Sequence, residues 1–370
     1  MQPTEAPTST NNTEFPCEAC GAKLLFQPGT SELSCPYCGH RQQIAAASAP
    51  APIVEHDFRA ALAQARTATA KDLSNDATQV QCTFCGAVSV TTRKADHCAF
   101  CGSPVVLSDD ARQFIRPESL LPFAIDAKRA RGEFERWLTQ LWFAPGDLAK
   151  RAKASGMDGV YLPYWTYDSA TRSQYSGERG DAYWETESYT DSEGRRQTRQ
   201  VRKIRWHHVR GQVDVEFDDV LVAGTKSLPR DMLEKLEPWD LGGLAPFDPA
   251  YLSGFLAERY GIDLEGGFAI AQERMDSRIR DEVRRDIGGD EQRIHGLQTT
   301  HHDTTFKHLL LPLWISSFRY REKVHRFVVN ARTGAVAGER PWSTAKIVLA
   351  VLAALVVIGA IVAIAMRSRG

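Results

Sequence analysis

The sequence predicts three successive parts: two small β modules held together by cysteine pairs, a larger α+β domain, and one C-terminal transmembrane helix. The eight cysteines all lie between Cys17 and Cys101. Residues 109–341 mix helical and strand-like patterns, and Ile347–Met366 is an apolar run without a charged side chain. The chain has 370 residues, of which 43% are hydrophobic and 25% are charged. These ordinary values exclude a wholly disordered or polytopic membrane protein.

The cysteines form four C-x-x-C pairs, and a glycine follows each pair. The pairs are Cys17 and Cys20, Cys35 and Cys38, Cys82 and Cys85, and Cys98 and Cys101. A C-x-x-C turn directs two thiolates at one ion, and two such turns joined by a short hairpin are typical of a zinc ribbon. The sequence therefore predicts two structural Zn²⁺ ions, each bound by four cysteines. Ribbon 1 covers residues 14–44, and ribbon 2 covers residues 79–108.

Disulfides and a thioredoxin-like redox pair are the alternatives to zinc. A redox pair would open a helix in a βαβ unit, which the pattern does not show, and a disulfide framework belongs to a secreted chain. Met1–Thr13 is polar and lacks the apolar core of a signal peptide. His40 and His97 each neighbour a cysteine and are spare donors, although a surface position is the simpler interpretation.

The apolar run Ile347–Met366 predicts a transmembrane helix. A helix of this length spans about 30 Å, the thickness of the hydrocarbon core of a bilayer. Lys346 and Arg367 bracket the run, and Trp342 lies where an interfacial aromatic side chain would sit. Because Met1–Thr13 carries no export signal, we expect a tail-anchored, single-pass membrane protein whose N-terminal bulk is cytoplasmic.

The other segments show helix and strand patterns of ordinary strength. Residues 1–13 are predicted to be a disordered tail, and residues 45–78 a linker with a short helix. Helices are expected at 127–141, 249–260 and 264–287, and strands at 160–167, 182–190, 195–217, 292–306, 309–320 and 324–330. The phrases Leu162–Trp165 and Leu311–Trp314 are alike, so an internal duplication is one interpretation and chance similarity is the other.

No catalytic constellation is indicated by the sequence. Ala223–Ser227 resembles a P-loop superficially, but a threonine separates its glycine from its lysine. Asp219 also stands where the first glycine belongs, so the phosphate cradle is missing. His207–His208 and His301–Asp303 are candidate ligands, but neighbours on a strand point to opposite faces. Every cysteine is assigned to zinc, so we expect a non-enzymatic protein. An enzyme whose active site the sequence does not reveal is an alternative.

The most basic stretch of the chain is Arg195–Arg210. In a hairpin, its cations would pair with Asp181, Glu185 and Glu187 on the facing strand. The alternatives are contact with anionic lipid head groups or with nucleic acid. The formal net charge of -1 becomes about -5 when two Zn²⁺ ions bind eight thiolates. This balance disfavours a binder that depends on nucleic-acid phosphates.

The order of these parts resembles the bacterial YdjG-like family of membrane-anchored tandem zinc-ribbon proteins. The resemblance rests on the cysteine pairs, the membrane helix, and the phrases Gly159–Trp165, Leu311–Trp314 and Val329–Gly334. Members are often labelled primosomal protein N′ (replication factor Y), superfamily II helicase or TFIIB-type zinc-ribbon protein. The resemblance implies that the eight cysteines bind zinc and that Ile347–Met366 is the anchor. It also implies recruitment of partners to the membrane, including flotillin-like (SPFH) proteins and the phage-shock coat protein.

Two functions from different classes follow from these observations. The first is a non-enzymatic zinc-ribbon adaptor that is tethered to the cytoplasmic face of the membrane and recruits protein partners. The second is a nucleic-acid-binding, replication-associated protein. A DNA-binding ribbon needs a basic surface, whereas ribbon 1 offers Lys23 and Arg41 against Glu18 and Glu32. The adaptor is therefore the preferred function.

Overall fold

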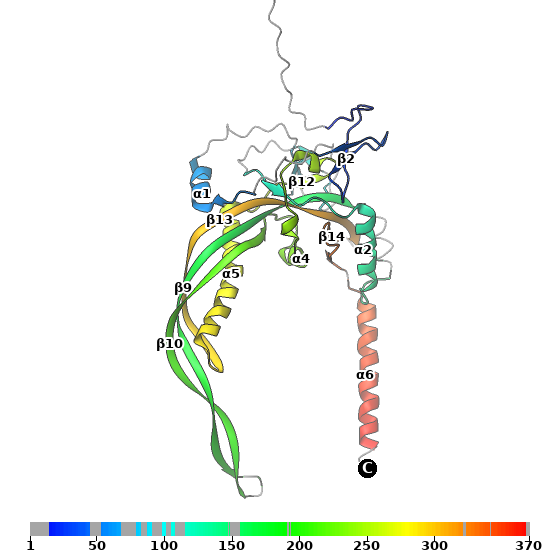
Figure 1. Cartoon of the computed structure of the whole chain (residues 1–370). Coiled ribbons are helices and arrows are strands. Elements are labelled where there is room, and N and C mark those ends of the chain that lie inside the picture. Colours follow the sequence, from blue (N-terminus) through cyan, green and yellow to red (C-terminus); the bar gives the residue numbers. More distant parts are fainter. Residues whose placement is uncertain are drawn as a thin grey trace, which may run out of the picture.

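The computed structural model describes residues 15–44, 53–67, 79–82, 87–90, 98–100, 105–107, 115–146, 148, 156–190, 192, 194–320, 323–340 and 342–367. The predicted disordered tail, much of the predicted linker, Cys85 and Cys101 lie outside these residues. The described chain forms a small sheet, a β-rich body, a long hairpin and a C-terminal helix (Figure 1).

The small sheet belongs to ribbon 1. Its strands β1 (Leu25–Phe26), β2 (Glu32–Ser34) and β3 (Arg41–Gln43) pair in this order, and both pairings are antiparallel. Gly29 lies in the turn between β1 and β2 with a φ of 80°, a conformation that glycine adopts without strain. The short hairpin expected between the first two cysteine pairs is therefore present.

A second sheet, of twelve strands, forms most of the body. Its long central strands β9 and β13 are antiparallel, and β4, β8, β10, β12 and β14 pair along them (Figure 1). The strands are β4 (His56–Asp57), β5 (Gln79–Cys82), β6 (Val88–Val90), β7 (Val105–Leu107), β8 (Ser119–Leu120), β9 (Asp158–Thr190), β10 (Arg196–Ala223), β11 (Ala245–Pro246), β12 (Leu256–Glu258), β13 (Glu291–Tyr320), β14 (Lys323–Asn330) and β15 (Val336–Gly338).

The two alike phrases of the sequence pair with each other at the centre of this sheet. Leu162 lies opposite Leu311, and Tyr161 lies opposite Pro312, because β9 and β13 are antiparallel neighbours. Leu162, Leu311 and Trp165 are fully buried. The two phrases therefore meet the same packing demand, and the fold does not show an internal duplication.

Two helices cover the sheet where the sequence predicts them. α2 (Ala127–Thr139) stacks Phe134 on Phe327 of β14, with ring centroids 3.6 Å apart. α5 (Leu264–Ile287) follows its predicted bounds, and the Asp263 side chain caps it by accepting from the Gly266 amide at 2.8 Å. The buried stripe of α5 recurs every fourth residue and packs on β9 and β10: Gly267, Ala271, Met275, Ile279, Val283 and Ile287.

The predicted helix at 249–260 is wrong. The chain instead makes a short 3-10 turn at Pro249–Leu252 and then enters β12. Gly254 separates the two with a φ of 95°, which a continuing helix does not allow. β12 pairs parallel to β9 and antiparallel to β6. Sheet pairing therefore overrides the local helical pattern. The strands expected at 292–306 and 309–320 are one strand, β13. Its pairing with β9 is unbroken from Phe306 to Leu309, and its bulges lie between Ile294 and Gly296 and between His302 and Thr305.

The strands expected at 182–190 and 195–217 pair as a hairpin of β9 and β10, and this hairpin extends beyond the body. β13 pairs with β9 only as far as Gly180, so residues 181–190 and 196–205 pair with each other alone among the described strands. We call these residues the hairpin tip. At about 3.4 Å per residue, the tip is about 34 Å long.

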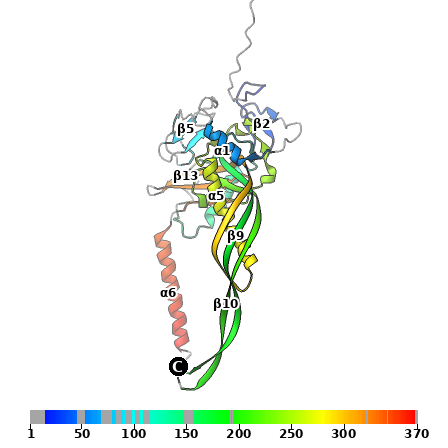
Figure 2. The ribbon, with the colours of Figure 1, turned by 90° about the vertical axis from the view of Figure 1, so that its left-hand side faces the viewer.

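α6 (Thr344–Arg367) is, among the described residues, the one helix long and apolar enough to cross a membrane. Its candidate span is Thr344–Val362, and none of this span is buried in the body. Figures 1 and 2 show α6 and the hairpin tip projecting from the same side of the body. The structure therefore agrees with a single membrane helix at the C-terminal end of the chain.

Candidate metal centre

Four thiols of ribbon 1 converge on one point. The Sγ atoms of Cys17 and Cys38 are 3.6 Å apart, and those of Cys20 and Cys35 are 3.5 Å apart. All four sulfur atoms lie within 4.8 Å of one another. Sulfur atoms about 2.3 Å from a tetrahedral ion would be about 3.8 Å apart, so this cluster has the dimensions of a four-cysteine metal site.

The two C-x-x-C turns share one local structure. The Gly21 amide donates to the Cys17 carbonyl at 2.8 Å, and the Gly39 amide donates to the Cys35 carbonyl at 3.0 Å. Gly21 and Gly39 have φ values of 73° and 74°, which would strain any other residue. The glycine after each pair is thus explained by the geometry that aims both thiols inward.

Backbone amides in the second turn favour a thiolate. Hydrogen bonds from the backbone of Cys38 and of Tyr37 lower the pKa of Cys35 to about 6, although desolvation opposes the shift. A thiolate is the form that binds a metal ion. In the same cluster the neighbouring thiols raise the pKa values of Cys20 and Cys38, so without an ion the amides of the turns favour one thiolate rather than four.

The cluster divides ribbon 1 into an inner and an outer side. Cys17 and Cys35 are buried, whereas Cys20 and Cys38 are exposed. The four cysteines of ribbon 1 form no disulfide with one another. Tyr37 is 83% exposed at the crest of the second turn. We call residues 18–21 and 36–39 the outer face of ribbon 1.

The inner side of ribbon 1 packs against the body. The ring of Phe26 contacts the rings of Tyr251 and Phe255, at centroid distances of 5.1 and 6.2 Å. The Phe26 amide donates to the Ser253 carbonyl at 3.0 Å, and the Ser253 hydroxyl donates to the Leu24 carbonyl at 2.5 Å. Ribbon 1 therefore shares a continuous hydrophobic core with the body.

Ribbon 2 is joined to the body through backbone pairing. β5 pairs with β6 and β7, and β6 pairs with β12, which neighbours β9. Cys82 and Cys98 are buried in the same core cluster as Leu162 of β9. Cys85 and Cys101 lie outside the described residues. The structure brings the first four predicted ligands together, and the second site stays a prediction.

The basic stretch Arg195–Arg210 is paired in part with acidic and aromatic side chains of its own hairpin. Lys203 Nζ lies 2.6 Å from Glu185 and 2.9 Å from Glu187. Arg199 lies 3.5 Å from Glu187, and the Arg205 guanidinium lies 5.0 Å from the ring centroid of Tyr183. These are the cross-strand pairs expected of a hairpin.

Among the described residues, a second group that could hold a metal ion is formed by Asp168, Asp218 and Asp219. A lysine side chain already lies in this group. Lys307 Nζ lies 2.7 Å from Asp219, 3.9 Å from Asp168 and 3.1 Å from Glu55. Asp168 also accepts a hydrogen bond from the Asp219 amide, beside bulges in both strands that flank β9. This cluster compensates charge at a bend in the sheet, and no histidine joins it.

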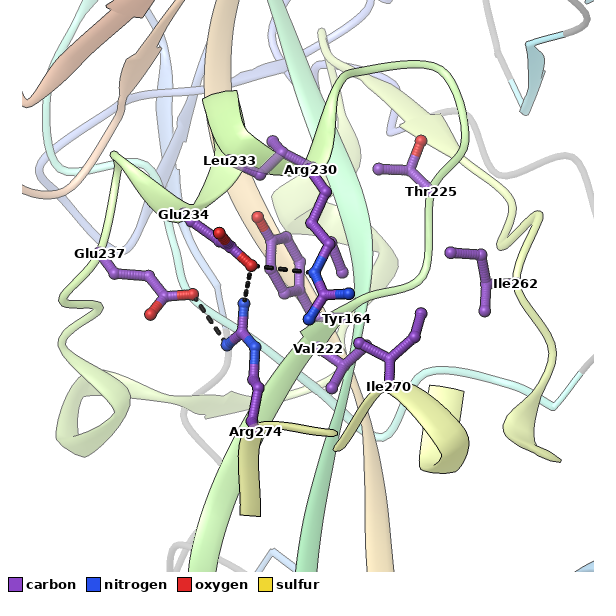
Figure 3. A pocket seen from close by; sticks show the side chains of 11 residues that line it. Tyr164, Val222, Thr225, Arg230, Leu233, Glu234, Glu237, Ile262, Ile270 and Arg274 are labelled. Atoms are coloured by element: carbon purple, nitrogen blue, oxygen red, sulfur yellow. Dashed lines mark hydrogen bonds and ion pairs between the residues drawn. The ribbon is translucent and has the colours of Figure 1, made fainter. Parts of the chain in front are cut away.

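A pocket lies between α4 (Arg230–Glu234), α5 and the body ends of β9 and β10 (Figure 3). Arg274 lies 3.0 Å from Glu234 and 3.1 Å from Glu237, and Arg230 lies 2.9 Å from Glu234. Both guanidinium groups are thus matched by carboxylates. The network fastens α4 to α5, and the pocket walls beyond it are mainly aliphatic.

The chain is 26% identical over 340 residues to an uncharacterized protein, YdjG, of Bacillus subtilis (strain 168). The similarity covers 90% of this chain and 91% of that protein. No family model matches the chain. No solved structure gives a significant match. The similarity to YdjG covers nearly the whole length of both chains, but the name of that relative assigns no activity, and no family model supports the zinc-ribbon or primosomal labels.

Proposed function

We propose that the protein is a non-enzymatic adaptor whose metal-stabilised body is tethered to the cytoplasmic face of a membrane, where it recruits protein partners. The observation that supports this function most is α6. A core helix buries at least one face, whereas the candidate span Thr344–Val362 has no part buried in the body. Insertion into a bilayer would remove this apolar surface from water.

The ion in ribbon 1 is proposed to be Zn²⁺ with a structural role. Four thiolates would close its coordination sphere and leave no position for water or substrate. The strands β1 to β3 are only two or three residues long, so the ion would supply much of the folding energy of this module. A second Zn²⁺ is proposed at Cys82, Cys85, Cys98 and Cys101.

The outer face of ribbon 1 is the proposed partner-binding surface. The inner side of the module is fixed to the body, so the outer face is presented in a constant orientation. Tyr37 stands at its crest, and exposed tyrosines are frequent anchors of protein interfaces. Flotillin-like (SPFH) proteins and the phage-shock coat protein are the partners proposed from the resemblance.

The partner surface is tested by affinity purification from detergent-solubilised membranes, followed by mass spectrometry. The Tyr37→Ala variant should lose partners that the unsubstituted chain retains. Tyr189→Ala is the matched control, because it removes an exposed tyrosine from the hairpin instead. Retention of every partner by Tyr37→Ala would reject this surface. Recovery of nucleic acid with a steep salt dependence would favour the replication-associated alternative.

The membrane tether and its orientation need separate measurements. The full chain should sediment with membranes and resist alkaline extraction, whereas a chain that stops after Ser343 should be soluble and folded. Protease added to sealed cytoplasmic-side-out vesicles should digest the body. Protection of the body from protease would reverse the proposed orientation.

A further inference from the structure

The segment after α2 meets the start of α6 at one point of the body. The Ser343 amide donates to the Phe143 carbonyl at 2.8 Å. The ammonium of Lys346 donates to the carbonyls of Trp142 at 3.3 Å and of Ala144 at 2.8 Å. Two segments that are distant in sequence are therefore held together where the candidate membrane span begins.

Three aromatic side chains are exposed at this junction. Trp142 is 80% exposed, Trp342 is 54% exposed and Phe143 is 37% exposed. The rings of Phe143 and Trp342 have centroids 6.5 Å apart, and the Arg340 guanidinium lies 4.2 Å from the centroid of Trp342. Exposed aromatic groups gathered from separate segments mark a surface that is covered in the working protein.

We propose that Trp142, Phe143 and Trp342 form an aromatic collar that seats the body in the head-group region of a phospholipid bilayer. This inference rests on the proposed membrane anchor and adds a second attachment, which comes from the segment after α2. We assign the bilayer as the partner that covers the collar, because the collar is continuous with the candidate span, which begins two residues after Trp342.

The chemistry of the collar matches the membrane–water interface. Tryptophan has an apolar ring and a polar N–H, so it is stable where hydrocarbon meets hydrated head groups. Arg340 and Lys346 flank the collar with positive charge that can face lipid phosphates. A protein partner would have to share this surface with the lipid around the first turn of α6.

The collar is tested by tryptophan fluorescence of the full chain in phospholipid nanodiscs. The chain has 8 tryptophans, so the signal of one is obtained by subtracting the spectrum of its Trp→Phe variant. Trp142→Phe removes the fluorophore and keeps an aromatic ring. Trp184→Phe is the matched control, because Trp184 is 67% exposed but lies on the hairpin tip. The probes are lipids brominated near the head group or deep in the acyl chain.

We expect the Trp142 signal to be lost with the shallow bromine and largely kept with the deep one. The Trp184 signal should be unaffected by both probes. An unquenched Trp142 in chains that have incorporated into nanodiscs would overturn the collar and leave the anchor standing. Equal quenching of Trp142 and Trp184 would also overturn it, since exposure rather than position would then decide lipid contact. Failure of the full chain to incorporate would reject the anchor itself.

Discussion

Ribbon 1 and ribbon 2 carry the same cysteine motif but join the body by different means. Ribbon 1 keeps a sheet of its own and docks through side chains, with Phe26 against Tyr251 and Phe255. Ribbon 2 contributes its strands to the large sheet through the pairing of β6 with β12. A cysteine motif thus predicts a ligand set, whereas the attachment of the module depends on side chains and strand edges outside the motif.

The largest expected effect is that of Cys35→Ser. Serine replaces a thiolate poorly, and structural zinc contributes on the order of 10 kcal/mol to folding a small module. Elemental analysis should find one zinc ion fewer per chain, and amides of β1 to β3 should lose protection from hydrogen exchange. Amides of β5 to β7 should stay protected, because their ladder continues into β12. Loss of protection in both modules would show that they fold as one unit.

Cys98→Ser should remove the second proposed ion with a smaller loss of structure. The strands of ribbon 2 remain hydrogen-bonded to the large sheet, and Phe100 beside this cysteine is fully buried in the core. Elemental analysis should give two zinc ions for the full chain and one for each cysteine variant. A full chain that binds a single zinc ion would reject the second site.

Ser253→Ala should loosen ribbon 1 without releasing its ion. The substitution leaves the buried carbonyl of Leu24 without the hydroxyl that now contacts it, at a cost of about 1–3 kcal/mol. Hydrogen exchange should accelerate at β1, with the zinc content unchanged. Ser188→Ala on the exposed hairpin tip is the control and should change neither. Unaltered exchange at β1 would mean that this contact does not hold the module in place.

Tyr37→Ala should have the smallest effect on stability, within about 0.5 kcal/mol, because its side chain is mostly in water. Thermal unfolding and zinc content should match those of the full chain. This result would separate the outer face, which is free to bind, from the inner side, which holds the module to the body. A marked drop in the unfolding temperature would instead assign Tyr37 a packing role.

The features that the sequence predicts well are those with local causes. The C-x-x-C-Gly turn needs a left-handed glycine, and Gly21 and Gly39 have that conformation. Residues 264–287 form the predicted helix because its buried stripe and the Asp263 cap lie within the segment. The long hairpin is likewise expected locally, because the strand patterns at 182–190 and 195–217 lie on either side of a short turn.

The features that the sequence does not predict depend on distant partners. Residues 256–258 become a strand only because β9 and β6 lie on either side of them. The docking of Phe26 against Tyr251 joins residues that are far apart in the chain. Neither Trp142 nor Phe143 carries a local sign of its contact with α6, so the junction could not be recognised before the fold was known.

The hairpin tip and α6 run in the same direction from the body (Figures 1 and 2). A bilayer that enclosed α6 in this pose would also enclose the tip, whose charged side chains include Glu187, Arg199 and Lys203. Each such charge costs about 2.5–3.5 kcal/mol in the middle of the hydrocarbon. Because the contacts of Ser343 and Lys346 hold the start of α6 to the body, the change falls on the hairpin, whose tip pairs with no further described strand and must bend away from the head groups as the helix inserts. The hairpin then lies beside the anchor at the membrane surface, and its length limits the angle that the body can take relative to the bilayer.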